Sequence, residues 1–282
     1  MFQNYLKLAF RNLSRQKVFS FINITGLAIG LASSLIILLW VQDEMSFDRF
    51  HQKATRTYRL TAEAGDLQVA ITPAPMAPSL KEALPEIEHI ARLWPSTRAM
   101  MQAGDLKFGE KKGFYTEPSF FEVFDFKLLK GDTKTALAQP NGVILSEALA
   151  KKYFGTVDVL GKSLRKDNQD DFTVTGILAL QPGNSHLQID FLLPWSYVAT
   201  RERNIKDNIW DNFDFYSYIT FAQSRDHETV SAVEKKINNI YCDHEKELNV
   251  QFHLQPLTDI HLHSHFMADV AGHGNFQYVT VL

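Results

Sequence analysis

The sequence has little cysteine, no excess of basic residues and a low average hydrophobicity. Cys242 is the only cysteine among 282 residues, which excludes a disulfide scaffold. Lys and Arg number 29 against 32 Asp and Glu, so the basic balance expected of a nucleic-acid-binding domain is absent. A mean hydropathy of −0.17 argues against a protein made mostly of membrane spans. The 12% aromatic content excludes a disordered chain, and the length fits one large domain or two ordinary ones.

Charge is missing altogether from residues 18–41. As a helix these 24 residues would be about 36 Å long, and the hydrocarbon core of a membrane needs about 30 Å. A buried core helix of this length would show polar residues on one face. A signal peptide has a shorter apolar region followed by a small-residue cleavage site, which the sequence around Leu39–Gln42 lacks. The sequence therefore predicts an uncleaved transmembrane helix over 18–41.

The charges on either side predict the orientation of this span. Residues 1–17 carry four Lys or Arg and no acid, whereas Asp43, Glu44 and Asp48 follow the span. The positive-inside rule then places residues 1–17 in the cytoplasm and the chain after Val41 outside. Apolar residues at helical spacing also predict a short amphipathic helix at the inner interface, with a continuation of the span as the alternative: Phe2, Leu6, Ala9, Phe10 and Leu13.

Four small or polar residues fall close to one face of the predicted span: Asn23, Gly26, Gly30 and Ser33. Small residues let apolar helices approach closely in lipid, and an Asn can form a hydrogen bond across the contact. The pattern predicts a packing face against other spans or a second protomer. Chance is the alternative, because Gly and Ser are frequent in such helices.

The outer part reads as an α+β domain. Alternating residues predict a strand over 57–64, a short helix ends before Pro85, and a second strand follows over 87–94. A matching unit has strands over 213–221 and 248–257. Its helix carries the stripe Val230, Val233, Ile237 and Ile240. Two such β-α-β units can pair into one sheet around an inserted mixed lobe.

The inserted lobe has shorter elements and more turn signals. Gly104-Asp105 and Gly109 indicate hairpin turns, and Ser146 and Gly155 bound a helix. The other elements are expected over 118–124, 143–145, 172–177 and, beside that last strand, 187–193. The core domain is then predicted to be two-lobed over 42–275, with a flanking lobe of 42–95 and 213–275 and an inserted lobe of 96–212.

Three motifs resemble active-site features and are set aside. Gly155 and Gly161 are separated by five residues where a phosphate-binding loop needs four, so a turn is expected. The acidic run 167–171 lacks the glycine and late Glu of a calcium loop and is expected to be a solvated hairpin tip. On a strand, three histidines could converge on zinc, but solvated loop histidines are preferred: His261, His263 and His265. We therefore predict no catalytic residue, metal or cofactor.

A set of short motifs spread over most of the chain carries a resemblance to a known family. They lie at 4–7, 11–13, 24–30, 44–48, 58–60, 120–126, 129–132, 144–147, 153–155, 160–162 and 259–262. Together they resemble the N-terminal part of MacB/FtsX-type ABC transporter permeases, including the MacB-like periplasmic core domain.

The resemblance implies a function. Such permeases pair with a cytoplasmic ABC ATPase, dimerise with a second permease protomer in the lipid bilayer, and place the core domain in the periplasm at the inner membrane. It implies a non-enzymatic subunit that couples ATP hydrolysis to export or partner handling, and leaves a periplasmic adaptor or outer-membrane channel open. The alternatives are a membrane-anchored ligand-binding sensor ectodomain and, more weakly, an anchored metallohydrolase using the C-terminal histidines.

The last residues differ from the family pattern. Permeases of this type continue with further spans, whereas here the apolar run 276–282 is too short to cross lipid. We expect this run to be the start of a truncated second span, and the chain to be a fragment.

Overall fold

The computed structural model describes residues 2–96, 98–201, 212–213, 216–225, 230–246, 249–264, 266–269, 274, 276 and 279. The chain divides into two compact units, one of residues 1–46 with 275–282 and one of residues 47–274. Most of the predicted start of a second span over 276–282, together with His265 and residues 202–211, lies outside the described residues.

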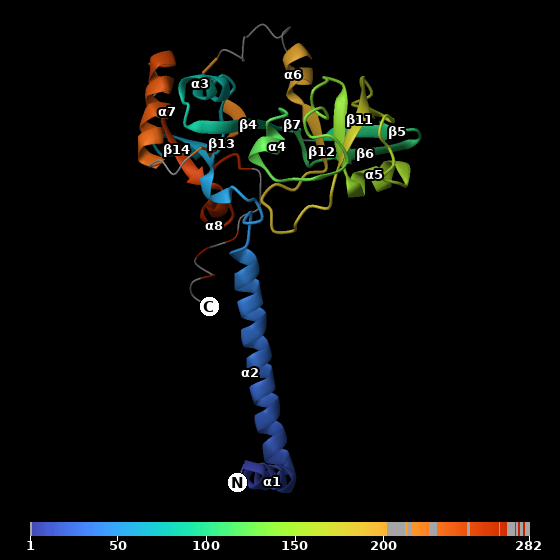
Figure 1. The fold of residues 1–282 in the computed structure, drawn as a ribbon, viewed down its shortest axis with the longest axis vertical. Coiled ribbons are helices and arrows are strands. Elements are labelled where there is room, and N and C mark those ends of the chain that lie inside the picture. The colour runs from blue at the N-terminus through green and yellow to red at the C-terminus, as the bar shows by residue number, and fades with distance from the viewer. Residues whose placement is uncertain are drawn as a thin grey trace. The chain divides into compact units, whose positions relative to one another are not determined.

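The N-terminal unit contains two helices, α1 (Phe2–Arg15) and α2 (Lys17–Glu44). Gln16 has φ −112° and ψ 59°, outside the helical region, so the chain bends there and α1 is not a continuation of α2 (Figure 1). The two helices are therefore separate, and the amphipathic segment expected over residues 1–17 at the inner interface remains a prediction.

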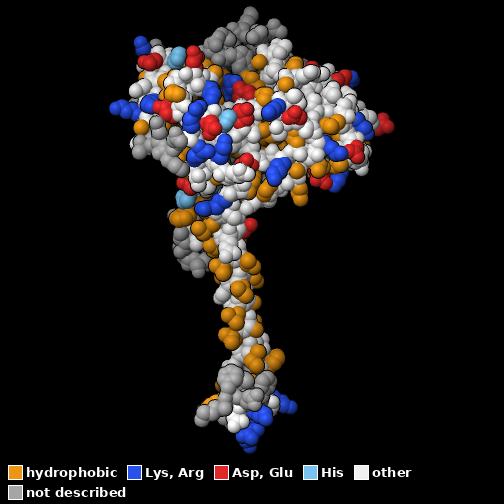
Figure 2. Space-filling model, viewed as in Figure 1, with side chains coloured by type: hydrophobic (Ala, Val, Ile, Leu, Met, Phe, Trp, Pro, Cys, Tyr) orange, Lys and Arg blue, Asp and Glu red, His pale blue; other side chains and the backbone are white. Residues whose placement is uncertain are grey.

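Helix α2 contains the whole predicted span. It is 28 residues long, and none of its residues is buried. Within the described part of the chain it is the one helix long and apolar enough to cross a membrane. Figure 2 shows hydrophobic side chains along its length. The hydroxyl of Ser33 donates to the carbonyl of Ile29 at 2.9 Å, so this polar group is satisfied within the helix.

The compact unit of residues 47–274 contains two interleaved β-α-β motifs, which we call β-α-β units. β1 (Thr57–Ala64) and β4 (Ile87–Ser96) are joined through α3 (Met76–Ala83), and β13 (Tyr216–Ser224) and β14 (Gln251–Pro256) through α7 (Val230–His244). Their antiparallel order is β14-β1-β13-β4, so each unit holds one strand of the other between its own two strands. We call these strands and helices the flanking lobe.

The flanking lobe forms because its helices and strands each have one apolar face. Leu60 of β1, Leu80 of α3, Ile90 of β4, Ile237 of α7 and Phe252 of β14 belong to one buried cluster. Residues of the same strands with the opposite parity, such as Leu93 and Phe221, belong to a second cluster with α4 and the segment after β14. The sheet is therefore covered on both faces.

The same sheet continues through the inserted lobe in the order β4-β7-β12-β9-β11-β10-β5-β6. Its strands are β5 (Ala99–Ala103), β6 (Leu106–Glu110), β7 (Gly113–Thr116), β9 (Gly142–Ser146), β10 (Ser163–Lys166), β11 (Asp170–Leu178) and β12 (Phe191–Pro194). The helices are α4 (Phe120–Val123), α5 (Glu147–Phe154) and α6 (Trp195–Arg201). The short elements are β2 (Leu67–Val69), β3 (Thr72–Pro73), β8 (Leu128–Gly131), η1 (Ala54–Arg56), η3 (Leu257–Asp259) and α8 (Ile260–His263).

The α+β architecture agrees with the prediction, and so do several local details. Ser146 caps α5 by accepting a hydrogen bond from the amide of Leu149, and Gly155 ends it with φ 72°. The residue boundaries predicted for the two lobes remain a prediction.

Two expectations for the inserted lobe are wrong. Gly109 lies inside β6 opposite Met100, and the turn is at Gly104, whose φ is 56°. The segment 187–193 is not beside the strand 172–177, because β12 pairs with β7 and β9. The parallel strand β9 takes the place next to β11.

Candidate functional site

Residues 47–52, directly after α2, form what we call the junction segment. Asp48 is fully buried. Its φ of 57° is left-handed, a conformation that Asp tolerates better than most residues, and it turns the chain sharply. The Asp48 amide donates to the carbonyl of Asn184 at 2.9 Å. The junction segment is thereby attached to the loop between β11 and β12.

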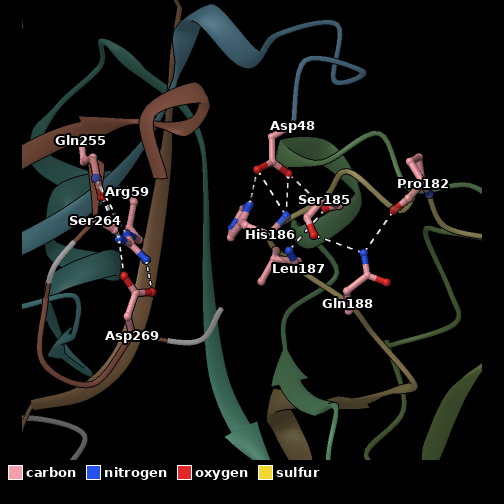
Figure 3. A network of polar contacts seen from close by, with 10 residues as sticks. All are labelled: Asp48, Arg59, Pro182, Ser185, His186, Leu187, Gln188, Gln255, Ser264 and Asp269. Atoms are coloured by element: carbon pink, nitrogen blue, oxygen red, sulfur yellow. Dashed lines mark hydrogen bonds and ion pairs between the residues drawn. The ribbon is translucent and has the colours of Figure 1, made fainter. Parts of the chain in front are cut away.

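The Asp48 carboxylate makes the strongest contacts of the segment (Figure 3). It accepts hydrogen bonds from the Ser185 hydroxyl at 3.0 Å, from the His186 amide at 3.2 Å and from Nδ1 of His186 at 2.8 Å. An ionised carboxylate only accepts, so Nδ1 of His186 carries the proton. Burial acts to raise the pKa of Asp48, but the charge and hydrogen bonds of His186, with the Ser185 hydroxyl, hold it below its usual value.

His51 is a second buried polar group of the junction segment. Its Nδ1 accepts from the amide of Asp125 at 3.0 Å, and the rings of Phe50, Phe124 and Phe126 surround it. Among the residues that the structure describes, its buried Nε2 has no hydrogen-bond partner. Burial lowers the pKa of His51 to about 4, against the opposing effect of Asp48 and Asp125. His51 is therefore neutral at pH 7.

The junction segment also contacts the C-terminal part of the domain. Phe47 stacks on His261 of α8 with ring centroids 3.4 Å apart and planes 2° apart. His261 is buried, which differs from the expected solvated loop histidine.

A second network holds the segment after α8. Arg59 of β1 is fully buried and donates to both carboxylate oxygens of Asp269, at 2.6 and 2.9 Å. The same guanidinium donates to Gln255 at 2.7 Å and to Ser264 at 2.8 Å (Figure 3). Each of the three guanidinium nitrogens donates at least one hydrogen bond, and a bidentate, hydrogen-bonded pair is the arrangement in which a buried charge pair is tolerated. The Asp48 network thus holds the first residues of the domain, and the Arg59 network holds the segment that contains Asp269.

A cavity of about 790 Å³ lies where the two lobes meet. We call it the lobe cavity. Phe47, Trp94 and Ile219 line it from the flanking side, and Lys112, Phe114 and His186 line it from the inserted side. Its volume is within the range of pockets that hold small molecules, which occur preferentially at such junctions.

The motifs singled out in the sequence do not converge on one place. His261 and His263 lie in the short helix α8, not on a strand, with His261 buried and His263 exposed. Asp167 and Asn168 form the turn between β10 and β11, as expected of a hairpin tip. Residues 155–163 connect α5 to β10, as expected of a turn. The four residues of the predicted packing face lie on α2.

The sequence reasoning missed Asp48, His51, His186 and Arg59 as site residues. In the sequence, Asp48 stands out only as one of the acidic residues after the predicted span and as the last residue of the motif 44–48. Its partner His186 is 138 residues away, so nothing local in the sequence pairs them.

A match between this sequence and a known protein family shows which family the chain belongs to. The family described as the MacB-like periplasmic core domain matches residues 20–240, more than half of the chain. The chain belongs to this family. Residues 20–240 are thus a MacB-like periplasmic core domain. No curated protein matches it significantly.

Solved structures of related domains share the MacB-like fold. A domain of a proposed permease from Porphyromonas gingivalis is 24% identical, with a TM-score of 0.62 over 73% of this chain and 91% of that one. The periplasmic region of MacB from Actinobacillus actinomycetemcomitans is 16% identical, with a TM-score of 0.53 over 73% and 91%. The extracellular domain of the noncanonic ABC-type transporter YknZ from Gram-positive bacteria is 14% identical, with a TM-score of 0.52 over 71% and 99%.

The buried His51 predicts a specific pH dependence of stability. Unfolded His51 takes up a proton below about pH 6.5, whereas the folded form does so only near its pKa of about 4. Unfolding therefore binds a proton between these values, and the free energy of unfolding falls by about 3 kcal/mol as the pH drops through them. His51→Asn keeps an acceptor for the Asp125 amide and removes the titration. Urea unfolding at pH 6.5 and 4.5 should show a smaller loss in this variant than in the wild type.

The matched control is His263→Asn, which changes an exposed histidine. It should keep the full pH dependence of the wild type. Equal slopes for wild type and His51→Asn would contradict the assignment of this dependence to His51.

Proposed function

We propose that this chain is a permease subunit whose core domain couples ATP hydrolysis by a cytoplasmic ABC ATPase to export or partner handling outside. The observation that carries the proposal is the attachment of the junction segment, directly after α2, to the β11–β12 loop through Asp48. A displacement of α2 along or about its axis would act first on this segment. Because Asp48 is buried and accepts several hydrogen bonds, the segment cannot slide without losing them.

We further propose the arrangement in the membrane. The basic residues of 1–17 and the acidic residues after the span favour a cytoplasmic α1 and a periplasmic core domain at the bacterial inner membrane. The strand order supports a flanking lobe of about 42–95 and 213–275 around an inserted lobe of about 96–212. A periplasmic adaptor or outer-membrane channel would meet the outer surface of this domain.

The orientation can be tested with the native cysteine. Cys242 is exposed on α7, so a membrane-impermeant maleimide should label it in intact spheroplasts. In a Cys242→Ser background, Ser14→Cys places the thiol on α1, and labelling should require permeabilised membranes. The opposite result would reverse the proposed orientation: labelling of the Ser14→Cys variant in intact spheroplasts, and protection of Cys242 in the native chain.

We also propose that Asn23, Gly26, Gly30 and Ser33 form a packing face of α2. All four are exposed on this helix, and a Cβ added at Gly26 or Gly30 meets no atom within 4 Å. The double variant Gly26→Leu/Gly30→Leu should leave the helix intact but prevent close approach of a second helix.

The measurement is energy transfer between labelled copies of the full chain in lipid vesicles. The glycine double variant should associate at least about tenfold more weakly. Ala28→Leu/Ala32→Leu places the same leucine side chains on the opposite face of α2, at 100° per residue, and should associate like the wild type. Equal association of both double variants would contradict the proposed packing face.

The partner is tested by purifying the tagged full-length chain from its native membranes. An ABC ATPase should co-purify, and its absence under conditions that keep the membrane complex intact would contradict the proposed function. In the purified complex, addition of ATP should change the rate at which trypsin cleaves the core domain, by about threefold or more.

The coupling step is tested by Asp48→Asn, which removes the charge that His186 faces. This variant should still co-purify the ATPase but lose the ATP-dependent change in cleavage. Asp105→Asn changes an exposed Asp in the β5–β6 turn and should behave like the wild type. An unchanged ATP response in a folded Asp48→Asn variant would show that motion does not pass through this contact.

A further inference from the structure

The walls of the lobe cavity are largely apolar. Phe47, Trp94 and Phe114 supply aromatic rings, and Ile71 and Ile219 supply aliphatic side chains. Trp94 and Ile219 belong to strands β4 and β13, and Ile71 lies just before β3. Such a surface favours the apolar body of a ligand.

The charge of the cavity is positive. Lys111 and Lys112 line it and are exposed, and neither forms an ion pair with a carboxylate in the described part of the chain. Asp269 is the only carboxylate among the described lining residues, and Arg59 neutralises it in a buried pair. Asp190 is close enough to Lys112 to feel its charge, which leaves Lys111 as the less compensated cation.

Several polar groups that line the cavity are already engaged by the protein. His186 Nδ1 and Ser185 donate to Asp48, and Gln188 donates to the carbonyls of Pro182 and Ser185. The two lysines supply the cationic groups that a ligand could contact, and Nε2 of His186 is a further buried nitrogen that has no partner among the described residues. A single anionic group therefore fits this cavity better than a molecule with polar groups all round.

The place of Phe47 in the sequence further narrows the class of ligand that the cavity would bind. Phe47 lines it, and only Met45 and Ser46 separate Phe47 from the end of α2. A wall of the cavity thus comes from the residues that directly follow the candidate membrane span. Molecules with an apolar body and an acidic head are the class that concentrates at a lipid surface.

We propose that the lobe cavity binds an amphipathic anion, with its apolar body against Phe47, Trp94 and Phe114 and its carboxylate or phosphate at Lys111 and Lys112. This binding is a property of the core domain and does not depend on an ATPase. Failure to find an ATPase partner would therefore leave it standing.

The experiment titrates soluble probes into the full chain in phosphatidylcholine nanodiscs and measures the heat of binding, with empty nanodiscs as the blank. Octanoate and octyl phosphate distinguish a carboxylate from a phosphate head, and octanol is the neutral analogue. We expect one saturable site for at least one of the anions, and binding of octanol weaker by about tenfold. Heats equal to those of empty nanodiscs, or equal affinity for octanol, would overturn the proposal.

Two variants with matched controls locate the site. Lys111→Ala/Lys112→Ala should weaken the anion by about tenfold, whereas Lys127→Ala/Lys134→Ala removes two exposed lysines elsewhere and should not. Gly183 lines the cavity and has open space where a Cβ would lie, so Gly183→Trp should obstruct binding.

Gly109→Trp adds the same bulk at an open glycine of β6 that does not line the cavity, and should bind like the wild type. Urea midpoints identify any variant that fails to fold, and the lysine pair and Gly183→Trp test the site independently of each other. Binding that survives both Lys111→Ala/Lys112→Ala and Gly183→Trp in folded protein would overturn the assignment to this cavity.

Discussion

The buried carboxylate of Asp48 is the constraint on which the rest of the domain depends. A charge removed from water is stable only when its lone pairs are occupied, and here Ser185 and His186 occupy them. Both partners come from the loop between β11 and β12, on the inserted side of the domain. Asp48, in the segment that follows α2, thereby binds a loop far away in sequence, and that loop forms one wall of the lobe cavity.

The two polar networks differ in chemistry. Arg59 holds the segment after α8 through a buried, bidentate ion pair with Asp269. The junction segment instead depends on Asp48 and on the neutral His51, whose pKa of about 4 reflects burial among aromatic rings.

Local features were predictable from the sequence, and distant pairings were not. Ser146 and Gly155 bound α5 as expected, because capping and a left-handed C-cap are decided within a few residues. The strand over 57–64 was predicted at its observed bounds from alternation alone. The neighbour of 172–177 was predicted wrongly because strand pairing depends on topology. The contact of Arg59 with Asp269 spans 210 residues, and no pattern near either residue indicates the other.

The sheet that crosses from one lobe to the other has a mechanical consequence. β4 and β7 share a backbone ladder from Leu93 opposite Thr116 to Ser96 opposite Gly113, directly at the lobe boundary. Opening the lobes about a hinge would break these hydrogen bonds, whereas a change in sheet twist would keep them. The ladder therefore favours a change of twist shared by both lobes over a hinge between them. Such a twist would run along the strand order from β14 to β6 and would pass β4, β7 and β13, which supply walls of the lobe cavity.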